Sequence, residues 1–465
     1  MRRLLVSLVA IGLTACQAEN VQPEVEHADK RYDQLLLADD QLQGWLAQAT
    51  EEDSAWAFDS QLDVLGAQFV ELALHMGRLD SNYVDAYHGP DIWKTTTDAM
   101  TPDAERLAGD IDSLKMMLAA FDSEDQSEAV RKAQLGKLLR AMSVRLKVVT
   151  GEAVAFDTEV SEIYDVTPPI YDLSKYDAVL AEIDALVPGE GDLAARVDAF
   201  RNSLAIPTDK LAPVFERAIA ECRARTEAHY TLPEGETFRM EFVTDKSWSG
   251  YNYYQGGYES LIQINTDFPI IIDRAVDLGC HEGYPGHHVW NLFIEQELVG
   301  ERGWIEYTVN PLFGPFGPIA EGSANFGIEL AFPANEKIAF ERDVLFPMAG
   351  LDPADASKLA ALNALTGQLS HATNDVARRY LDGDITREEA VPLIQRYYLA
   401  SLEKSAQRVS FIDTYRGYVI NYNIGRDLAR EWVDAAGDDT AARWGAFEAM
   451  LTGPVTASDI VAARD

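Results

Sequence analysis

The stretch that decides the fold is His281-Glu282-Gly283-Tyr284-Pro285-Gly286-His287-His288. The chain has eight histidines in its 465 residues, and three of them lie in this octapeptide. A His-Glu pair followed by another histidine is typical of zinc hydrolases, in which the histidines bind the metal and the glutamate transfers protons. The usual spacing is His-Glu-x-x-His, so Pro285 and Gly286 are two additional residues between the histidines.

The insertion changes where the second ligand can lie. On a regular helix, the step from His281 to His287 rotates the side chain by about 240°, and the step to His288 separates the two rings by roughly 10 Å. Neither pair could then share one zinc ion at bond lengths of about 2 Å. Pro285 and Gly286 can break the helix, because proline lacks the N–H and glycine adopts unusual dihedral angles. An extruded loop would return His287 to the ligand position, so the geometry favours His287 and leaves His288 as the alternative.

A later acidic residue, Glu321 in the stretch Glu-Gly-Ser-Ala, completes the pattern. With His-Glu-x-x-Pro-Gly-His-His, the chain resembles the bacterial "domain of unknown function 885" family. Members of this family are often lipoproteins and look like distant relatives of helical zinc peptidases such as thimet oligopeptidase and dipeptidyl-peptidase III. The resemblance implies a mostly helical fold with one zinc ion between two core helices, His281, His287 and Glu321 as its ligands and Glu282 as the general base. The family usually has tryptophan where this chain has Ser323, which bears on the shape of the substrate pocket.

These residues predict zinc-dependent hydrolysis of short peptides in the periplasm. Two imidazoles and one carboxylate leave an open position for water on a tetrahedral ion. Glu282 would take the proton of that water and pass it to the leaving amine. Tyr422, in a Tyr-x-x-Gly sequence that also matches the family, is the candidate donor to the oxyanion, and His288, Arg416 and Arg426 are weaker candidates. The residues that we expect to contact the substrate are Tyr258, His288 and Arg426.

Two other functions fit the same residues. The chain could be a non-catalytic periplasmic lipoprotein with a vestigial metal site, although a site without turnover would not need Glu282. It could also be a metallohydrolase of non-peptide amides or esters, which the motif does not distinguish from peptides.

The N-terminus predicts a lipoprotein signal peptide. Arg2 and Arg3 precede an apolar stretch, residues 4–13, that is too short to span a bilayer as a mature helix. It ends in Leu13-Thr14-Ala15-Cys16, which resembles the site cut by bacterial lipoprotein signal peptidase and would leave Cys16 lipidated; an ordinary secretory signal is the alternative. Gln17 after the cysteine favours the outer membrane, with the protein facing the periplasm.

The composition is strongly acidic, with 76 Asp and Glu against 39 Lys and Arg and a formal net charge of −37. Such a chain repels nucleic acid and anionic lipid surfaces. We therefore expect short peptides as partners, no nucleic acid, and contact with a membrane only through the lipid anchor. The negative field also favours cationic over anionic peptides.

Two further cysteines, Cys222 and Cys280, remain beside Cys16. They could form a disulfide in an oxidising compartment. A domain of this size can bury a large core and needs no covalent cross-link, so two buried free thiols are the favoured interpretation.

Helical apolar spacing dominates the rest of the chain, for example at Leu62, Leu65, Phe69, Leu72 and Met76. We expect a signal peptide at residues 1–15, a lipidated cysteine with a flexible tether at 16–40, and one helical metallopeptidase-like domain at 41–465. The predicted fold class is mainly α: a large helical zincin-like domain with a small antiparallel β-sheet beside the active-site cleft.

The sheet is predicted at residues 238–265, where aromatic and apolar residues alternate around Gly256 and Gly257. In helical zinc peptidases a strand at this place lies along the cleft and pairs with the substrate backbone. We expect residues 257–265 to be this edge, and a packed hairpin without substrate contact is the alternative. A folded protein could not present an extended segment to a buried metal, so the expected substrates are short.

Overall fold

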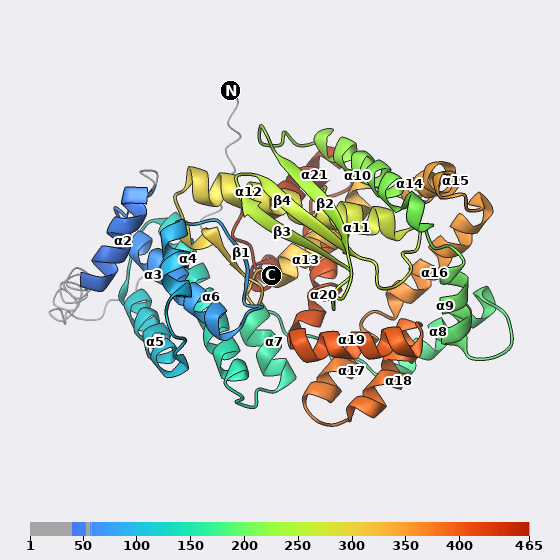
Figure 1. Cartoon of the computed structure of the whole chain (residues 1–465), viewed down its shortest axis with the longest axis horizontal. Coiled ribbons are helices and arrows are strands. Elements are labelled where there is room, and N and C mark those ends of the chain that lie inside the picture. Colours follow the sequence, from blue (N-terminus) through green and yellow to red (C-terminus); the bar gives the residue numbers. More distant parts are fainter. Residues whose placement is uncertain (1–39, 53–55, 57, 465) are drawn as a thin grey trace, which may run out of the picture.

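The structure is a computed structural model that describes residues 40–52, 56 and 58–464 (Figure 1). The predicted signal peptide, Cys16 and residues 17–39 of the tether lie outside the described residues. Among the helices that are described, none has the length and apolarity needed to cross a bilayer.

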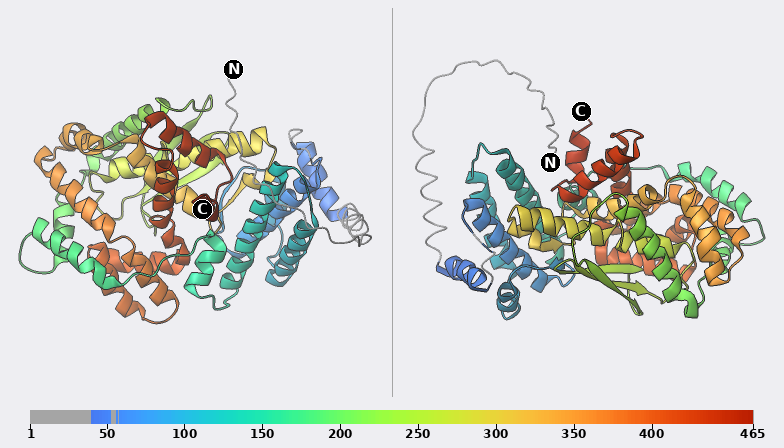
Figure 2. Two further views of the ribbon diagram at one scale, coloured as in Figure 1. Left: turned by 180° about the vertical axis from the view of Figure 1, so that it is seen from behind. Right: turned by 90° about the horizontal axis from the view of Figure 1, so that it is seen from above.

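The described chain is mainly helical, as the apolar spacing predicts. The stripe at Leu62, Leu65 and Phe69 is buried in α3, where a capping box between Ser60 and Asp63 satisfies backbone N–H groups at the start of the helix. The N-terminal helices gather at one end of the long axis (Figure 1 and Figure 2). They are α2 (Asp40–Glu52), α3 (Gln61–Leu79), α4 (Asp91–Asp98), α5 (Ala104–Ala120), α6 (Gln126–Val149) and α7 (Phe156–Tyr164).

The remaining helices form the other end and the centre of the molecule (Figure 2). Those at the far end are α8 (Asp177–Leu186), α9 (Leu193–Asn202), α14 (Glu336–Phe340), α15 (Phe346–Ala349) and α16 (Ala356–Gln368). Those along the lower edge of Figure 1 are α17 (Ala372–Leu381), α18 (Arg387–Tyr398) and α19 (Leu402–Tyr415). The others are α10 (Leu211–Glu227), α11 (Arg274–Glu282), α12 (His287–Phe293), α13 (Gly317–Ala331), α20 (Ile424–Asp434), α21 (Thr440–Thr452) and α22 (Ala457–Ala462).

A three-stranded sheet lies over α11 and α12, in the region where the sequence predicts it. Its strands are β2 (Thr237–Val243), β3 (Gly250–Gly256) and β4 (Glu259–Asn265), in the spatial order β2-β4-β3. β3 and β4 form an antiparallel hairpin, but β2 runs parallel to β4, so the sheet is mixed. The prediction that residues 257–265 form the substrate-binding edge is wrong, because β4 is paired on both sides. The edge strands of this sheet are β2 and β3, and β3 is the one that packs against α11.

A second, two-stranded sheet joins distant parts of the chain. β1 (Val84–Tyr87) pairs antiparallel with β5 (Val309–Pro311), and β1 also contacts β3. This arrangement places a segment from the N-terminal region beside the strand that covers α11.

The octapeptide interrupts one helix, as the proline and glycine predict. α11 ends at Glu282 and α12 begins at His287, with residues 283–286 as a loop between them. The loop folds back against the end of α11, where the Gly286 N–H donates to the Cys280 carbonyl at 3.0 Å. A Cβ on Gly286 would lie 1.8 Å from the His281 carbonyl oxygen, so only glycine fits this return.

Candidate metal centre

Three potential ligands converge where α11, α12 and α13 meet. His281 lies in the last turn of α11, His287 is the first residue of α12, and Glu321 lies in α13. The two histidine Nε2 atoms are 3.1 Å apart, and Glu321 Oε2 is 3.2 Å from His281 Nε2 and 3.6 Å from His287 Nε2. The loop thus brings His287, and not His288, beside His281.

The spacing of these donor atoms fits a small tetrahedral ion. Zinc–ligand bonds of about 2.0–2.1 Å at tetrahedral angles place any two donors about 3.3 Å apart. The observed separations of 3.1, 3.2 and 3.6 Å lie around this value. Glu321 Oε2 is buried and has no hydrogen-bond partner among the described residues, so it is available to a cation. Two imidazoles and one carboxylate suit zinc.

The electrostatics of the centre also favour a cation. Burial by itself lowers the pKa of His287, but the charges of Glu321, Glu282 and Asp85 outweigh burial and raise this pKa to about 9. Burial raises the pKa of Glu321, but the neighbouring His287 and His281 hold it well below its usual range. Negative charge that stabilises a protonated imidazole would also stabilise a metal ion at the same place.

Asn325 orients the first histidine. Its Nδ2 donates to the Tyr422 carbonyl at 2.9 Å, so its Oδ1 faces His281 Nδ1 at 3.1 Å. An amide oxygen accepts a proton, so Nδ1 of His281 is the protonated nitrogen and Nε2 is left with its lone pair toward Glu321. Asn325 follows Glu321 by four residues on α13, which places both side chains on one face of that helix.

Close packing of α13 against α20 brings a tyrosine to the third ligand. A Cβ on Gly322 would lie 2.2 Å from the Gly425 carbonyl carbon, so the helices can touch only because both residues are glycine. Tyr418, just before α20, donates its hydroxyl to Glu321 Oε1 at 2.5 Å. This bond leaves Glu321 Oε2 to face the histidines. Gly425 is the glycine of the Tyr-x-x-Gly sequence, which therefore has a packing role.

Glu282 lies beside the first ligand and beneath β3. Its side chain is 4% exposed, and burial raises its pKa. A Cβ on Gly250 would lie 2.8 Å from Glu282 Oε1, and Asn252 Nδ2 donates to the Glu282 carbonyl at 2.7 Å. No side chain or backbone group in the described part of the chain hydrogen-bonds its carboxylate. The carboxylate is therefore free to accept a proton.

His288 does not face the centre. It is 0% exposed, its Nδ1 lies 2.8 Å from Ser260 Oγ, and its Nε2 lies 2.9 Å from Glu236 Oε2. Glu236 also accepts the Tyr284 hydroxyl at 2.7 Å. Both ring nitrogens of His288 are thus engaged by protein groups, and the structure gives this residue a packing role instead of the predicted contact with substrate or oxyanion.

Of the other predicted residues, only Tyr422 is next to the ligands. Its ring is stacked near His281 with 6.5 Å between centroids, and its hydroxyl has no hydrogen-bond partner among the described residues. Arg416 pairs with Glu159 at 2.7 Å, and Arg426 pairs with Asp427 at 3.5 Å. Tyr258 lies in the β3–β4 turn with a φ of 64°, and no described contact joins it to the ligands.

Asp85 is a residue of this region that the sequence did not indicate. Burial raises its pKa to about 6, and the charges of His287, Glu321 and Glu282 also act on it. It belongs to β1, about two hundred residues before the octapeptide. No local pattern marks an aspartate in a short strand, so only the packing of β1 against β3 could have identified it.

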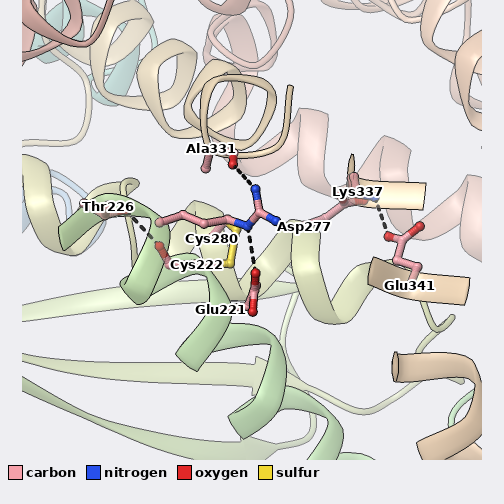
Figure 3. Close-up of a disulfide and its surroundings, with 9 residues drawn as sticks. Glu221, Cys222, Thr226, Asp277, Cys280, Ala331, Lys337 and Glu341 are labelled. Atoms are coloured by element: carbon pink, nitrogen blue, oxygen red, sulfur yellow. Dashed lines mark hydrogen bonds and ion pairs between the residues drawn. A yellow bond between two sulfur atoms is a disulfide. The ribbon is translucent and has the colours of Figure 1, made fainter. Parts of the chain in front are cut away.

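The interpretation of Cys222 and Cys280 as free thiols is wrong. They form a disulfide with a Cα–Cα distance of 5.5 Å, which joins α10 to α11 (Figure 3). Both residues are 0% exposed. The size of the domain makes a cross-link unnecessary for a core, but α10 packs directly along α11 and brings the two side chains together. The bond fixes the residue immediately before His281.

Comparison with known proteins assigns no function to the chain. No protein-family model matches it, and no curated protein matches its sequence. A protein of Colwellia psychrerythraea that is named as a lipoprotein has 14% identity and a TM-score of 0.47, over 90% of this chain and 68% of that one. A Shewanella oneidensis protein of unknown function, also named as a lipoprotein, has 12% identity and a TM-score of 0.46, over 95% and 87%. A structure named BsuCP has 12% identity and a TM-score of 0.40, over 87% and 89%.

Proposed function

We propose that this protein is a zinc-dependent hydrolase of short peptides. The observation that carries the proposal is the convergence of His281, His287 and Glu321 on one point, at the spacing of zinc ligands, with Glu282 adjacent to the first of them. These three residues would hold the ion. When bound, zinc acts as a Lewis acid toward a carbonyl and makes water a stronger nucleophile near neutral pH.

Glu282 and Tyr422 would perform the proton transfer and the stabilisation of charge. The Glu282 carboxylate, which lacks a hydrogen-bond partner among the described residues, would take a proton from the attacking water and deliver it to the leaving amine. The Tyr422 hydroxyl, equally without a described partner, would donate to the oxygen on which negative charge develops. Asn325 and Tyr418 act indirectly, since they orient His281 and Glu321.

The free edge of β3 supports a peptide as the substrate. β3 pairs only with β4 in its sheet; β1 packs near β3, and no described backbone hydrogen bond joins the two strands. Gly250 of this strand lies directly against Glu282. An extended peptide could add to this edge as a further strand, which would bring its backbone past the proton-transferring carboxylate. An ester or a small amide would not use such an edge.

The proposed place of action is the periplasm, with the protein held to a membrane by a lipid on Cys16. The sequence Leu13-Thr14-Ala15-Cys16 supports the anchor. The disulfide between Cys222 and Cys280 suits an oxidising compartment. The outer membrane is the expected address, from Gln17 alone.

The test is a digest of a peptide library by the zinc-loaded protein, read by mass spectrometry with and without a chelator. The parent should cleave peptides, the chelator should stop cleavage, and Glu282→Gln should lower kcat by at least about 100-fold. Glu403→Gln, at an exposed position on α19, is the matched control and should leave kcat unchanged. Cleavage that persists with the chelator, or in Glu282→Gln at the parent rate, would refute the proposal.

A further inference from the structure

A half-buried carboxylate, Asp85, is bound to β3, the strand that packs against Glu282, and forms no ion pair among the described residues. Asp85 Oδ1 accepts the Tyr251 hydroxyl, and Asp85 Oδ2 accepts from Asn310 Nδ2 at 3.1 Å. Each oxygen is therefore held by a neutral donor, from β3 on one side and from β5 on the other. These bonds fix the position of the negative charge but do not neutralise it.

Several buried carboxylates of the chain form an ion pair, whereas no ion pair involves Asp85 among the described residues. Asp80 pairs with Arg145 at 2.6 Å, and Glu306 pairs with Arg131 at 2.7 Å. The groups whose charges act on Asp85 are two of the candidate ligands, His287 and Glu321, and the candidate base, Glu282. Because removing a charge from water is costly, an unpaired carboxylate at such a place is well suited to a cationic ligand.

A cluster of aromatic rings lies on the β3 side of this carboxylate. On β3, the rings of Tyr251 and Tyr253 lie 4.4 Å apart, and Trp248 lies 5.5 Å from Tyr251. Burial raises the pKa of Tyr415, a hydrogen bond with Ser247 lowers it, and the charge of Asp85 raises it. Aromatic faces attract ammonium groups, and a carboxylate forms charge-assisted hydrogen bonds with them. Neither the rings nor the carboxylate would favour an anion.

The strand that carries these rings also leads to the reaction site. Tyr251 and Tyr253 are on β3, whose first residue, Gly250, lies against Glu282. A peptide that adds to the edge of β3 would therefore pass both Glu282 and the Asp85 region. A cationic group of that peptide would reach Asp85 while its backbone lies near the metal centre.

We infer that Asp85, with Tyr251 and Tyr253, forms a subsite for a primary ammonium group of the peptide substrate. The inference rests on the proposed function and specifies its substrate class: peptides with a free amine close to the scissile bond. The amine can be the substrate's α-amino group or the side chain of a lysine, and both present the same chemistry to Asp85.

The experiment compares peptides that differ only in this amine. One pair has a free or an acetylated N-terminus, and a second pair, acetylated throughout, has lysine or norleucine beside the scissile bond. In the parent, kcat/KM should be roughly 10-fold to 100-fold higher for the amine-bearing member of one pair, and the pair that shows the preference identifies the source of the amine. Asp85→Asn should reduce that ratio toward one, and Tyr253→Leu should reduce it in part. Asp209→Asn, at an exposed position, should keep the parent ratio.

A binding measurement separates failure of the subsite from failure of the proposed function. Saturation-transfer NMR of glycyl-leucinamide and of its acetylated form requires no turnover. The parent should bind the free amine more tightly, and Asp85→Asn should lose the difference while its thermal unfolding stays cooperative. Absence of peptide cleavage with retained amine binding would overturn the hydrolase and keep the subsite. Equal rates and equal binding with and without the amine, or a preference unchanged in Asp85→Asn, would overturn the subsite.

Discussion

Asn325 Oδ1 lies 3.1 Å from His281 Nδ1. Asn325 is on α13, one helical turn after the candidate ligand Glu321. A single helix thus supplies one candidate ligand and the group that orients another. Asn325→Ala should weaken zinc binding by roughly 10-fold to 100-fold, because His281 loses the acceptor that fixes its tautomer and ring orientation. Competition with a zinc-sensitive dye would measure the dissociation constant. Asn325→Asp, which keeps an acceptor, should bind zinc at least as tightly as the parent, and equal affinities in all three proteins would exclude the orienting role.

The neighbouring histidines should behave differently when each is replaced by alanine. His287→Ala removes a candidate ligand whose side chain is 16% exposed and should abolish stoichiometric zinc binding with little loss of stability. His288→Ala leaves Glu236 and Ser260 without their partner and opens a cavity, so it should lower the free energy of unfolding by about 2–4 kcal/mol. Its zinc content should stay near one ion per chain. Metal analysis of both folded variants checks this, and the reverse pattern would make His288 the ligand.

The parts of the centre that the sequence predicts are those encoded within a few residues. The octapeptide specifies a helix break at Pro285-Gly286, and that break alone decides which histidine returns to His281. The groups around the centre depend on packing between distant segments instead. Asp85 comes from β1, and Tyr418 reaches Glu321 only because Gly322 and Gly425 let two helices touch.

The errors have the same physical origin. The hairpin of β3 and β4 is visible in the sequence, but the parallel addition of β2, which covers one side of β4, is not. The sequence pattern therefore indicates the wrong strand as the edge. The pairing of Cys222 with Cys280 likewise depends on α10 lying along α11, and 58 residues of chain separate the two cysteines.

The disulfide should stabilise the fold measurably. Closing a loop of this length restricts the unfolded chain, so replacing both Cys222 and Cys280 with alanine should lower the free energy of unfolding by about 2–4 kcal/mol. Urea unfolding of parent and variant would measure the difference. Thiol titration of the unfolded parent, in a form that starts at residue 41, should find no free thiol without reductant. Two titratable thiols would contradict the bond.

Glu236 should make stability depend on pH. Burial raises its pKa, but hydrogen bonds from His288 and Tyr284 outweigh burial and lower the pKa below the ordinary 4.5. A carboxyl with a lowered folded-state pKa stabilises the fold above its ordinary pKa, and this contribution is lost as the pH falls through the lowered value. Glu236→Gln should therefore destabilise the protein by roughly 1–3 kcal/mol near neutral pH and by progressively less below about pH 4.5. Urea unfolding across this range checks it, with Glu403→Gln as a control that shows no such trend. A gap between parent and Glu236→Gln that widens in acid would contradict the sign.

The net charge of −37 should make peptide selection sensitive to salt. A strongly negative molecule attracts cationic peptides over long distances, and this attraction is screened as the Debye length falls from about 30 Å at 0.01 M salt to about 3 Å at 1 M. For two hexapeptides of opposite charge, kcat/KM should favour the cationic one at low salt, and the ratio should shrink as salt is added. A neutral peptide is the control and should respond little.

The contact of an ammonium group with Asp85 is short and partly buried, so the part of the preference that Asp85→Asn removes should persist at high salt. A preference for acidic peptides at low salt would contradict the long-range effect without bearing on Asp85.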